Sequence, residues 1–451
     1  MFPKNNSMIN LRKIAVIGLI FALVPLWLRQ GLAEQDAISE SIPSLPAVNL
    51  EELIQTALER NPDIIAAKAE WLAEKKRIWI DSSLPDPMGE FDLMGSMRET
   101  RVGPEQNRYM ISQDIPFPLK LWEKGKMAGD EARAAFARYH AVERDIVNEL
   151  KKLYYELYYV DASIDAIGEI KEILKKFEGV AQARYANMSG AQRDVAKAQA
   201  EVSMSLEKLF MLRQKRESVI AMLNAILDHD PMTSVGKAII PEKPVLEKSL
   251  TELINLSVLN RQEIKEMEAM VSKGRREKTL AKLDFIPDLN VGFDYTFVGD
   301  GFTTEAPDMD GRDSWMFPLR INLPIWPSRN IPAIQEAQKK LEASKARLKK
   351  AENTAFYEVK DAYHRFDSAR QIVDLYETAV IPQAKLALSA DQAGYESGRV
   401  DFLTLLDSER VYLNAKLTHI EFFAESLKSY ADLVRAAGLD LNKDVIARQN
   451  S

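Results

Sequence analysis

The sequence predicts an α+β membrane protein: a trimeric 12-stranded β-barrel with four strands per chain, continued by a long α-helical coiled-coil tube. Three observations lead to this prediction: an internal duplication, short strands with two unlike faces, and very long charged helices. The chain has 451 residues and no cysteine, which excludes disulfides, thiolate zinc sites and acylation at a cysteine. Its net charge of −7 is spread along the chain without a basic cluster, which argues against nucleic acid as a partner.

The internal duplication is visible in three pairs of segments that occur in the same order in both halves. They are "LEELIQTALERNPDI" (50–64) with "LTELINLSVLNRQEI" (250–264), "LPDPMGEFDL" (84–93) with "IPDLNVGFDY" (286–295), and "ISQDIPFP" (111–118) with "LRINLPIWP" (319–327). This order predicts a first structural repeat over 49–230 and a second over 249–437. Proline and glycine mark 231–248 as the linker between them, and 438–451 is expected to be a C-terminal tail.

The N-terminus has the order of a secretory signal peptide, namely positive charge, apolar run and small residues. The three features are Lys4, Arg12 and Lys13, then Ile14–Leu28, then Gly31 and Ala33. We therefore expect a signal peptide over 1–33, followed by an N-terminal linker over 34–48. A retained N-terminal anchor is the alternative, and the sequence leaves open whether translation starts at Met1 or Met8.

Each half contains two predicted strands of about 10 residues, a length that crosses a bilayer as a tilted strand. They are Met88–Arg98, Gln106–Ile115, Leu289–Gly299 and Ser314–Leu323, the last with Pro318 as an unfavourable member. In "LNVGFDYTFV" (289–298) apolar residues alternate with small or polar ones, so this strand has two unlike faces. The alternative is a soluble antiparallel sheet with one wet face.

Aromatic residues at the strand ends favour the membrane interpretation, because they are typical of the girdle of a membrane barrel. The predicted girdle residues are Phe117, Trp122, Tyr295 and Trp326. Four strands cannot close a barrel, and an open edge in hydrocarbon leaves backbone groups unpaired at several kcal/mol each. Three copies related by cyclic symmetry supply about 12 strands without leftover edges, which predicts a homotrimer.

The remaining sequence predicts helices, so that each half has a short helix, two strands, a long helix, a break and another long helix. Between Leu119 and Ala186 the only interruptions are isolated glycines. In the last helix apolar residues recur at every seventh position, which indicates a coiled-coil seam; they are Leu406, Leu413, Ile420, Leu427 and Val434.

Several stretches resemble the TolC-like outer-membrane efflux channel family, over nearly the whole mature chain. They are "ALERNPDI" (57–64), "SQDIPFPLK" (112–120), "RDVAKAQAE" (193–201) and "GYESGRVDFLTLLDSERVYLNAK" (394–416). The resemblance implies a homotrimer in outer-membrane lipid, with a helical tube in the periplasm that docks on a periplasmic adaptor (membrane fusion) protein and, through it, on an inner-membrane efflux pump. It implies no enzymatic activity, and no cofactor is expected.

The expected function is therefore a passive outer-membrane exit duct of a tripartite efflux system. The stretch "PFPLKLWEKGKMAGDEARAA" (116–135) most resembles members that export heavy-metal cations, although many of those are lipoproteins and this chain has no cysteine to acylate. Two alternatives stay open: an outer-membrane channel of type I protein secretion, and a soluble periplasmic coiled-coil scaffold or adaptor.

The tube is expected to close at the two helix breaks that follow Tyr185 and Tyr395. Matching the family's second tip places Asp407 at the aperture and Thr404 one turn earlier, where the family often has a second acid; Asp194 is expected at the corresponding position of the first half. Rings of such carboxylates attract cations. The alternative is that Asp194 only favours a helix dipole and that Asp407 lies on a solvated face.

Four residues at the breaks are the candidate adaptor contacts: Gly190, Gly398, Arg399 and Val400. The two glycines are expected to allow the tight turns. No metal site is predicted from the four scattered histidines, and "LDHDP" (227–231) is interpreted as a helix end.

Overall fold

The computed structural model describes residues 47–100, 102–300 and 311–439. The predicted signal peptide, nearly all of the N-terminal linker, the tail from residue 440 and most of the loop in the second strand pair lie outside the described residues. The elements of the first half are α1 (Leu50–Arg60), α2 (Pro62–Ser82), β1 (Met88–Thr100), β2 (Gly103–Ile115), α3 (Pro118–Ala186) and α4 (Gln192–Ile226). Those of the second half are α5 (Leu250–Asn260), α6 (Gln262–Leu283), β3 (Leu289–Val298), β4 (Ser314–Met316), β5 (Leu319–Ile321), α7 (Pro327–Leu375), η2 (Tyr376–Val380), α8 (Ile381–Glu396) and α9 (Phe402–Ala436).

Both halves have a helix that was not predicted between the short helix and the strands, namely α2 and α6, and in the second half the predicted long helix is divided into α7, η2 and α8. In the first half, α1 and α2 are separated at Asn61. Its side chain accepts hydrogen bonds from the N–H groups of Asp63 (3.0 Å) and Ile64 (3.2 Å) and so caps α2. Pro62 at the first position of α2 has no N–H to continue α1. In the second half Arg261 lies at the corresponding break, and the capping box of Ser249 and Glu252 starts α5.

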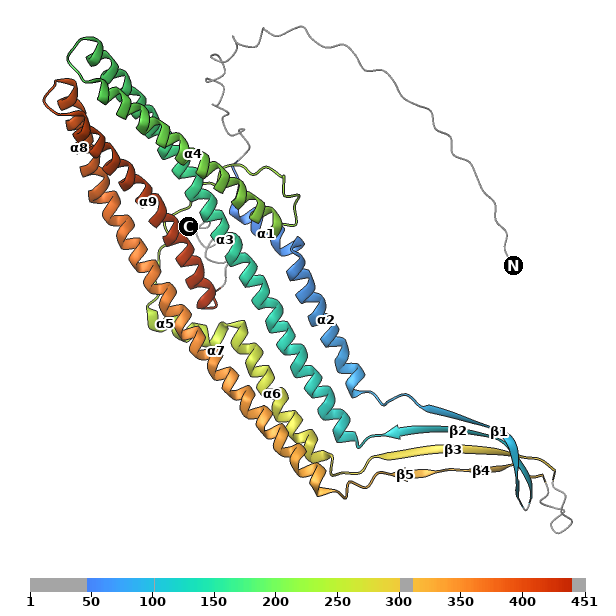
Figure 1. Ribbon diagram of the computed structural model, residues 1–451. Helices are drawn as coiled ribbons and strands as arrows, with labels where there is room; N and C mark the ends of the chain where they lie inside the picture. Colours follow the sequence, from blue (N-terminus) through green and yellow to red (C-terminus); the bar gives the residue numbers. More distant parts are fainter. Residues whose placement is uncertain (1–46, 101, 301–310, 440–451) are drawn as a thin grey trace, which may run out of the picture. The chain divides into compact units, whose positions relative to one another are not determined.

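The strands form one antiparallel sheet in the order β1-β2-β3-β4, with β5 also pairing β3 (Figure 1). The predicted single strand over Ser314–Leu323 is wrong, since β4 and β5 flank Phe317 and Pro318. Proline has no N–H for the ladder, and the Pro318 carbonyl instead accepts a hydrogen bond from the Gly292 N–H at 3.0 Å. The other predicted limits differ by one to three residues, at the ends of β1 and β3 and at the start of β2.

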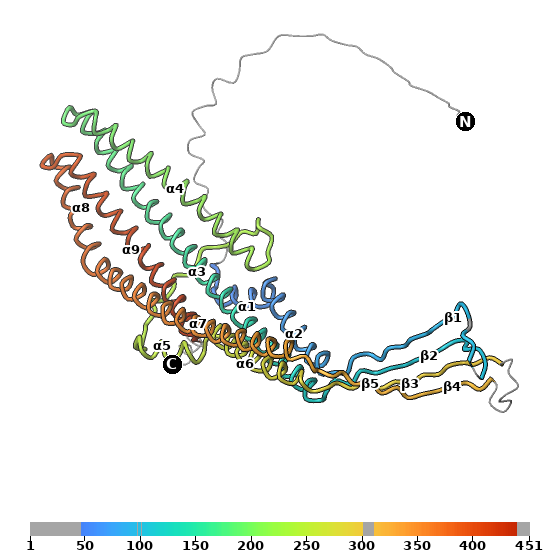
Figure 2. The backbone as a smooth tube through the Cα atoms, turned by 60° about the horizontal axis from the view of Figure 1, so that its bottom comes forward, coloured from blue at the N-terminus to red at the C-terminus, as the bar shows by residue number. Residues whose placement is uncertain are grey.

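The helices lie side by side around α3, which packs against α2, α4, α6 and α9 (Figures 1 and 2). With 69 residues, α3 runs about 100 Å from the strands to the turn before α4. The end of α4 meets the start of α2, where Asn61 donates a hydrogen bond to the Ile226 carbonyl at 2.9 Å. The end of α9 likewise meets the start of α6, because a Cβ on Gly438 would lie 3.0 Å from the Arg261 nitrogen.

Apolar stripes hold these helices together. Four of the five heptad positions predicted for the last helix are buried, since Leu406, Leu413, Leu427 and Val434 are at most 5% exposed, whereas Ile420 is half-buried. Each fully buried leucine contributes about 1.5–3 kcal/mol of burial energy, so these stripes hold the hairpins together far more strongly than surface ion pairs do. Pro382 in the first turn of α8 follows the π-helical turn η2, as expected where a ring disrupts helical hydrogen bonding.

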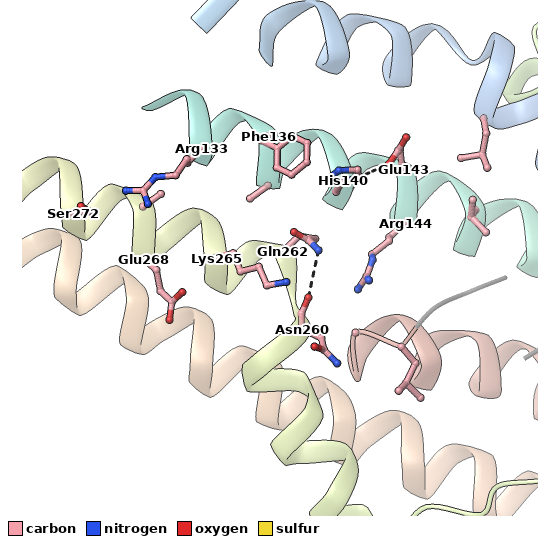
Figure 3. Close-up of a pocket in the computed structure, with 16 residues that line it drawn as sticks. Arg133, Phe136, His140, Glu143, Arg144, Asn260, Gln262, Lys265, Glu268 and Ser272 are labelled. Atoms are coloured by element: carbon pink, nitrogen blue, oxygen red, sulfur yellow. Dashed lines mark hydrogen bonds and ion pairs between the residues drawn. The ribbon is translucent and has the colours of Figure 1, made fainter. Parts of the chain in front are cut away.

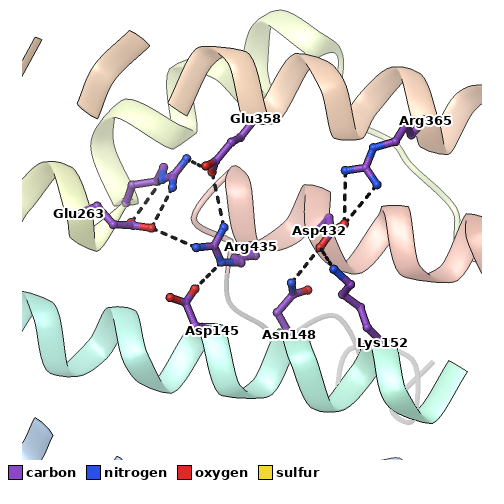
Figure 4. Close-up of polar contacts among 9 residues, drawn as sticks. Asp145, Asn148, Lys152, Glu263, Glu358, Arg365, Asp432 and Arg435 are labelled. Carbon is purple, nitrogen blue, oxygen red and sulfur yellow. Dashed lines mark hydrogen bonds and ion pairs between the residues drawn. The ribbon is translucent and has the colours of Figure 1, made fainter. Parts of the chain in front are cut away.

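An ion-pair cluster joins α3, α6, α7 and α9 where α9 meets α6 (Figure 4). Arg435 pairs with Asp145, with Glu263 at 3.6 Å and with Glu358 at 3.5 Å. Arg261 pairs with the same two glutamates at 2.8 and 2.7 Å. Hydrogen bonds and charges of these carboxylates raise the pKa of both arginines in spite of their burial, so the cluster fixes this junction at every physiological pH.

Candidate functional site

The turns at the ends of the long helices have the same backbone. In the first turn the N–H groups of residues 187, 188 and 189 donate to the carbonyls of residues 183, 185 and 184, at 3.1, 3.0 and 2.9 Å. In the second turn residues 397, 398 and 399 donate to 393, 395 and 394, at 3.1, 3.0 and 2.8 Å. Each residue of the first turn is therefore equivalent to the residue 210 positions later.

This equivalence corrects the role predicted for Gly190. Gly398 has the left-handed backbone that its turn requires, with φ of +76°, but its equivalent is Met188, with φ of +56° and a fully solvated side chain. Gly190 is instead equivalent to Val400. It is needed for close approach, because a Cβ there would lie 2.9 Å from the Arg184 Cβ.

At the contact between the helix and the residue after the bend, the two turns have their large and small residues in opposite positions. The first turn has Arg184 on its helix and Gly190 after the bend, whereas the second has Gly394 on its helix and Val400 after the bend. A Cβ on Gly394 would lie 3.1 Å from the Val400 Cβ. Of the predicted adaptor contacts, Gly398 and Arg399 are exposed, and Gly190 and Val400 are half-buried.

Arg184 connects the two hairpins, a role that sequence reasoning missed. Its guanidinium donates hydrogen bonds to the Tyr395 carbonyl and, at 3.2 Å, to the Ser189 carbonyl. The guanidinium carbon also lies 4.7 Å from the centre of the Tyr395 ring, a cation–π contact. No sequence signal separates this arginine from the other charged residues of the helix.

The two predicted gate tyrosines have different environments. Tyr185 is 48% exposed, whereas Tyr395 is 3% exposed and packs on Phe402 with ring centres 5.2 Å apart. The Tyr395 hydroxyl is buried and has no hydrogen-bond partner among the described residues. Burial, and next the negative charge of Asp194, raise the pKa of Tyr395. The Asp194 charge thus acts on a tyrosine of the other repeat.

The predicted gate carboxylates are not equivalent to each other. The 210-residue relation places Asp194 with Thr404, and Asp407 with Lys197. Asp194 lies in the first turn of α4 with 17% of its side chain exposed, where a negative charge favours the helix dipole. The Thr404 hydroxyl donates to Asp401, the N-cap of α9, at 3.1 Å. Hydrogen bonds from Thr404 and then Leu403 lower the pKa of Asp401.

Asp407 is exposed and lines an open groove of about 620 Å³ between α4 and α9. The groove also contains Thr404, Lys197, Glu201 and Arg410, so carboxylate and cationic groups face the same space. The structure thus brings Asp407 and Thr404 together and places a lysine beside them. A single chain offers this groove no ring of carboxylates.

Glu409 is a second residue that the sequence analysis missed. Its side chain is 1% exposed, and one of its carboxylate oxygens is buried without a hydrogen-bond partner among the described residues. Burial, followed by the negative charge of Glu201, raises its pKa to about 7, against a smaller opposite effect of Lys208 and Arg410. The signal was present: Glu409 follows Phe402 by seven residues and so occupies a core position of the heptad pattern.

The sheet has one apolar and one polar face. One cross-strand row consists of Phe91, Tyr109, Tyr295 and Trp315, and the next row consists of Glu90, Met110, Asp294 and Met316. Directly opposite residues lie on one face, so these rows lie on opposite faces. Phe91 and Trp315 are 69% and 63% exposed, whereas Asp294 is 1% exposed and accepts a hydrogen bond from Arg108 at 2.6 Å.

The predicted girdle residues lie at both ends of the strands. Phe117 and Trp326 are the N-caps of α3 and α7, and Trp122 lies one turn into α3 with the Lys126 ammonium 4.5 Å from its ring centre. Tyr295 lies in the aromatic row, and its hydroxyl donates to Asp313 at 2.7 Å. Their contact with lipid stays a prediction.

A charged contact fixes the sheet to α3. The Lys120 ammonium is buried and donates to the Asp288 carboxylate at 2.8 and 2.9 Å and to the Ile286 carbonyl at 2.8 Å. The Phe117 N–H donates to the same carboxylate at 2.8 Å. This contact joins the two repeats, because Lys120 follows β2 and Asp288 precedes β3.

A groove of about 980 Å³ lies between α3 and α6 (Figure 3). Its His140 is bound to Glu143 at 2.6 Å and packs on Phe136, with ring centres 4.4 Å apart. The remaining lining is mixed and open to solvent, with charged residues such as Arg133, Arg144 and Lys265 beside apolar and neutral polar ones. Across the described residues no three histidine or acidic side chains are grouped to hold a metal ion, and none of the described helices is apolar enough over a sufficient length to span a bilayer.

A duplicated strand pair with one apolar face, joined to two hairpins of long helices, defines the class of outer-membrane channels with a helical extension. The outer membrane efflux protein family matches residues 53–228 and 253–439, so the chain belongs to this family. Membership places it in the outer membrane, with the helical part in the periplasm, as an efflux channel and not an enzyme.

Relatives and solved structures agree with this assignment. The solvent efflux pump outer membrane protein SrpC of Pseudomonas putida is 22% identical over 438 residues, which cover 90% of each chain, and the toluene efflux pump outer membrane protein TtgI, also of P. putida, gives the same values. The outer membrane protein VceC of Vibrio cholerae has a TM-score of 0.73 at 18% identity, over 87% of this chain and 97% of that one. The CusC channel has a TM-score of 0.75 at 17% identity, over 88% and 94%.

Proposed function

We propose that three copies of this chain form the passive outer-membrane exit duct of a tripartite efflux system. The duct carries substrates from a periplasmic adaptor and an inner-membrane pump to the outside. The observation that supports this most is the open sheet: β1 at one edge, and β4 and β5 at the other, have no further strand partner in the described part of the chain. In lipid such edges need strands from other copies.

Three copies are the number that the sheet favours. Single-chain barrels begin at about 8 strands, and an open pore needs more, so 12 strands leave room for a solute path. The polar face with Arg108 and Asp294 then lines the lumen, and the row with Phe91 and Trp315 faces lipid. The girdle residues Phe117, Trp122, Tyr295 and Trp326 lie at the two interfaces of this barrel.

The helices offer a matching surface to neighbouring copies. Along the α2 and α4 side several large apolar side chains are more than 40% exposed: Ile65, Leu72, Trp79, Phe210 and Met211. Large apolar side chains exposed along one side of the molecule fit burial against another chain. Within the mature chain we propose repeats over 49–230 and 249–437, joined by 231–248, after removal of the signal peptide 1–33.

The aperture is proposed at the two turns. Asp194, Thr404 and Asp407, with Tyr185 and Tyr395 beside them, form the constriction, and Gly190, Gly398, Arg399 and Val400 contact the adaptor. Replacing both Asp194 and Asp407 by Ala is expected to raise single-channel conductance in planar bilayers and to weaken block by multivalent cations. Unchanged conductance and block would move the constriction elsewhere.

We propose metal cations as candidate substrates, because residues 116–135 resemble family members that export heavy-metal cations. The names of SrpC and TtgI assign those relatives to a solvent efflux pump and a toluene efflux pump. A deletion strain separates the two classes when its tolerance to Cu, Zn, Co and Cd is measured beside its tolerance to toluene and dyes. Lost tolerance to organic compounds with unchanged metal tolerance would exclude metal export.

Protein secretion by a type I system is the second candidate, because the same architecture serves either cargo. Identification of the inner-membrane pump that co-purifies with the channel separates the two. A soluble periplasmic scaffold does not agree with membership of an outer-membrane family.

A further inference from the structure

The two strand hairpins have the same register. In the first hairpin Met88 lies opposite Ser112 and Asp92 opposite Arg108; in the second Asn290 lies opposite Arg320 and Asp294 opposite Met316. The repeated segments 84–93 and 286–295 make positions of β1 correspond to positions of β3 that are 202 residues later, and the segments that start at 111 and 319 give an offset of 208 for the second strand of each hairpin. Positions of β2 correspond to positions of β4 and β5 that are 208 residues later, in spite of the break at Pro318.

The contact between β2 and β3 joins the end of one hairpin to the start of the next. Its register places Gly292 opposite Ser112, and Val291 opposite Gln113. The strands at the two outer edges of the sheet correspond to the two strands of this contact. Strand β5 corresponds to β2, and strand β1 corresponds to β3. The structure thus contains a template for the contact between one copy and the next.

We propose that β4 and β5 of one copy pair with β1 of the next copy in the register of the β2–β3 contact. The proposal rests on the trimeric duct proposed above. Transferring the template places Arg320 opposite Glu90 of the next copy, Leu319 opposite Phe91 and Phe317 opposite Leu93.

The side chains that this register brings together across the interface are complementary. Arg320 and Glu90 carry opposite charges on the polar face, where such cross-strand pairs stabilise and like charges destabilise. The two other pairs are apolar and lie on the apolar face. All four of their side chains are exposed in the single chain, at 63–79%. A slip by one residue would place Arg320 opposite a residue of the apolar face.

A second charge pair follows from the junction between sheet and helices. Arg329 corresponds to Lys120, since both donate their N–H to the helix N-cap carbonyl, at 3.2 and 2.7 Å. Asp86 corresponds to Asp288, since each ends the repeated "LPD" or "IPD" of its half. Within the described residues, neither Arg329 nor Asp86 forms an ion pair, and both are exposed. In the assembled barrel Arg329 is expected to bind Asp86 of the next copy, as Lys120 binds Asp288 within the chain.

The same chain cannot supply these contacts. Strands β1 and β5 are separated by β2 and β3, so their backbones lie about 14 Å apart at the usual strand spacing of about 4.8 Å. A disulfide requires Cα atoms about 4.4–6.8 Å apart. A bond between cysteines at positions 90 and 320 therefore has to connect two copies.

Cross-linking in the native cysteine-free chain tests the register directly. The double variant Glu90→Cys, Arg320→Cys is expressed in full length, extracted with its membrane and oxidised. Opposite residues of antiparallel strands have Cα atoms about 4.5–5.5 Å apart, within reach of a disulfide. The expected result is a covalent trimer on a denaturing gel without reductant, which reverts to monomer with reductant.

Two controls match this variant. Gln113→Cys with Val291→Cys places the thiols at the template contact inside one chain, and is expected to form an internal disulfide without a rise in covalent mass. Gly89→Cys with Arg320→Cys represents a slip by one residue and is expected to give no trimer. A covalent trimer from this slipped pair, without one from positions 90 and 320, would overturn the proposed register.

Light scattering of the reduced proteins distinguishes failure of the register from failure of the function. Non-covalent trimers without a 90–320 disulfide would overturn the register and leave the duct intact, whereas absence of trimers would overturn both. Charge exchange tests the junction: Arg329→Glu is expected to lose most of the heat-resistant trimer, and Arg329→Glu with Asp86→Lys to regain it. If the double variant forms no more heat-resistant trimer than Arg329→Glu alone, the proposed pair between Arg329 and Asp86 is wrong.

Discussion

The turns of the first and second hairpins have the same backbone hydrogen bonds but opposite side-chain roles. Arg184 of the first turn donates a hydrogen bond to the carbonyl of Tyr395 in the second turn, and the Tyr395 side chain is buried. At the equivalent positions Gly394 cannot reach across and Tyr185 is half exposed. Duplication thus preserved the backbone, while divergence made one turn the donor and the other the acceptor of a contact between hairpins.

The difference explains why the proposed aperture has to be treated as one unit rather than as two equal gates. The first turn contributes Asp194 near Tyr395, while the second contributes Thr404 and Asp407 on a groove that also contains Lys197. A change in either turn therefore alters a contact of the other. The predictions that follow use the 210-residue relation to pair each variant with its equivalent.

The largest difference is expected between Tyr395→Ala and Tyr185→Ala. Removal of a buried aromatic side chain costs about 3–5 kcal/mol, whereas a surface substitution usually changes stability by about 0.5 kcal/mol or less. Tyr395→Ala is therefore expected to lower the thermal transition of the helical part and to raise channel conductance, and Tyr185→Ala to change neither strongly. Equal effects of the two variants would contradict the asymmetry.

A pH effect of about 3 kcal/mol or less is expected from Glu409, whose pKa is raised to about 7 from an ordinary value of 4.5. Since the folded state holds this proton more tightly, its contribution to stability is fully present below about pH 4.5 and is lost as the pH rises to about 7. Conductance and protease sensitivity of the turns are expected to rise over this range.

The matched variant for this effect is Glu409→Gln, which keeps the size of the side chain and cannot ionise. It is expected to remove the pH dependence and to behave like the acidic form of the native chain. If the native protein and Glu409→Gln change in parallel between pH 4.5 and 7, another group controls the transition.

A smaller effect is expected from Arg184→Ala, which removes a charged donor from the Tyr395 carbonyl. Hydrogen bonds of charged groups contribute about 1.5–3 kcal/mol, and partial exposure of Arg184 favours the lower end of this range. Conductance in planar bilayers is expected to rise. Arg184→Lys keeps the charge but not the planar fork, so its conductance should fall between those of Arg184→Ala and the native chain.

The smallest effect is expected from exchanging the left-handed residues of the two turns. Gly398→Ala is expected to destabilise by about 1 kcal/mol, because its φ of +76° is unfavourable with a Cβ. Met188→Gly is expected to be neutral or to stabilise by less than about 1 kcal/mol, since Met188 already has φ of +56°. Thermal transitions measured side by side check the opposite signs.

Much of the fold could be predicted from the sequence, because its signals are periodic and local. Heptad spacing located α9, alternation located β3, and the repeated segments gave the order of elements in both halves. Two features could not be obtained in this way. The break before α2 depends on the Asn61 cap and its contact with the end of α4. The division of the last predicted strand at Pro318 depends on the hydrogen bond that the Gly292 N–H of β3 donates to the Pro318 carbonyl.

The candidate site could be located but not described. The turns were found because tyrosine and glycine mark the breaks, yet the residue with left-handed backbone in the first turn is Met188 rather than Gly190, and Asp194 is equivalent to Thr404 rather than to Asp407. The spacing between repeated segments changes from about 200 at the short helices to 210 at the turns, so an alignment of motifs alone misplaces residues by several positions. Arg184 acts through contacts between hairpins, which no local pattern contains, whereas Glu409 could have been found from its core position in the heptad pattern.

The central claim is that three copies of this chain close one barrel in the outer membrane. The most direct test is the mass of the detergent-extracted protein by light scattering, after separation of inner and outer membranes. The account predicts three copies per particle, recovered from the outer-membrane fraction. A soluble monomer or dimer would show that the four strands are satisfied without neighbours, and would contradict the duct.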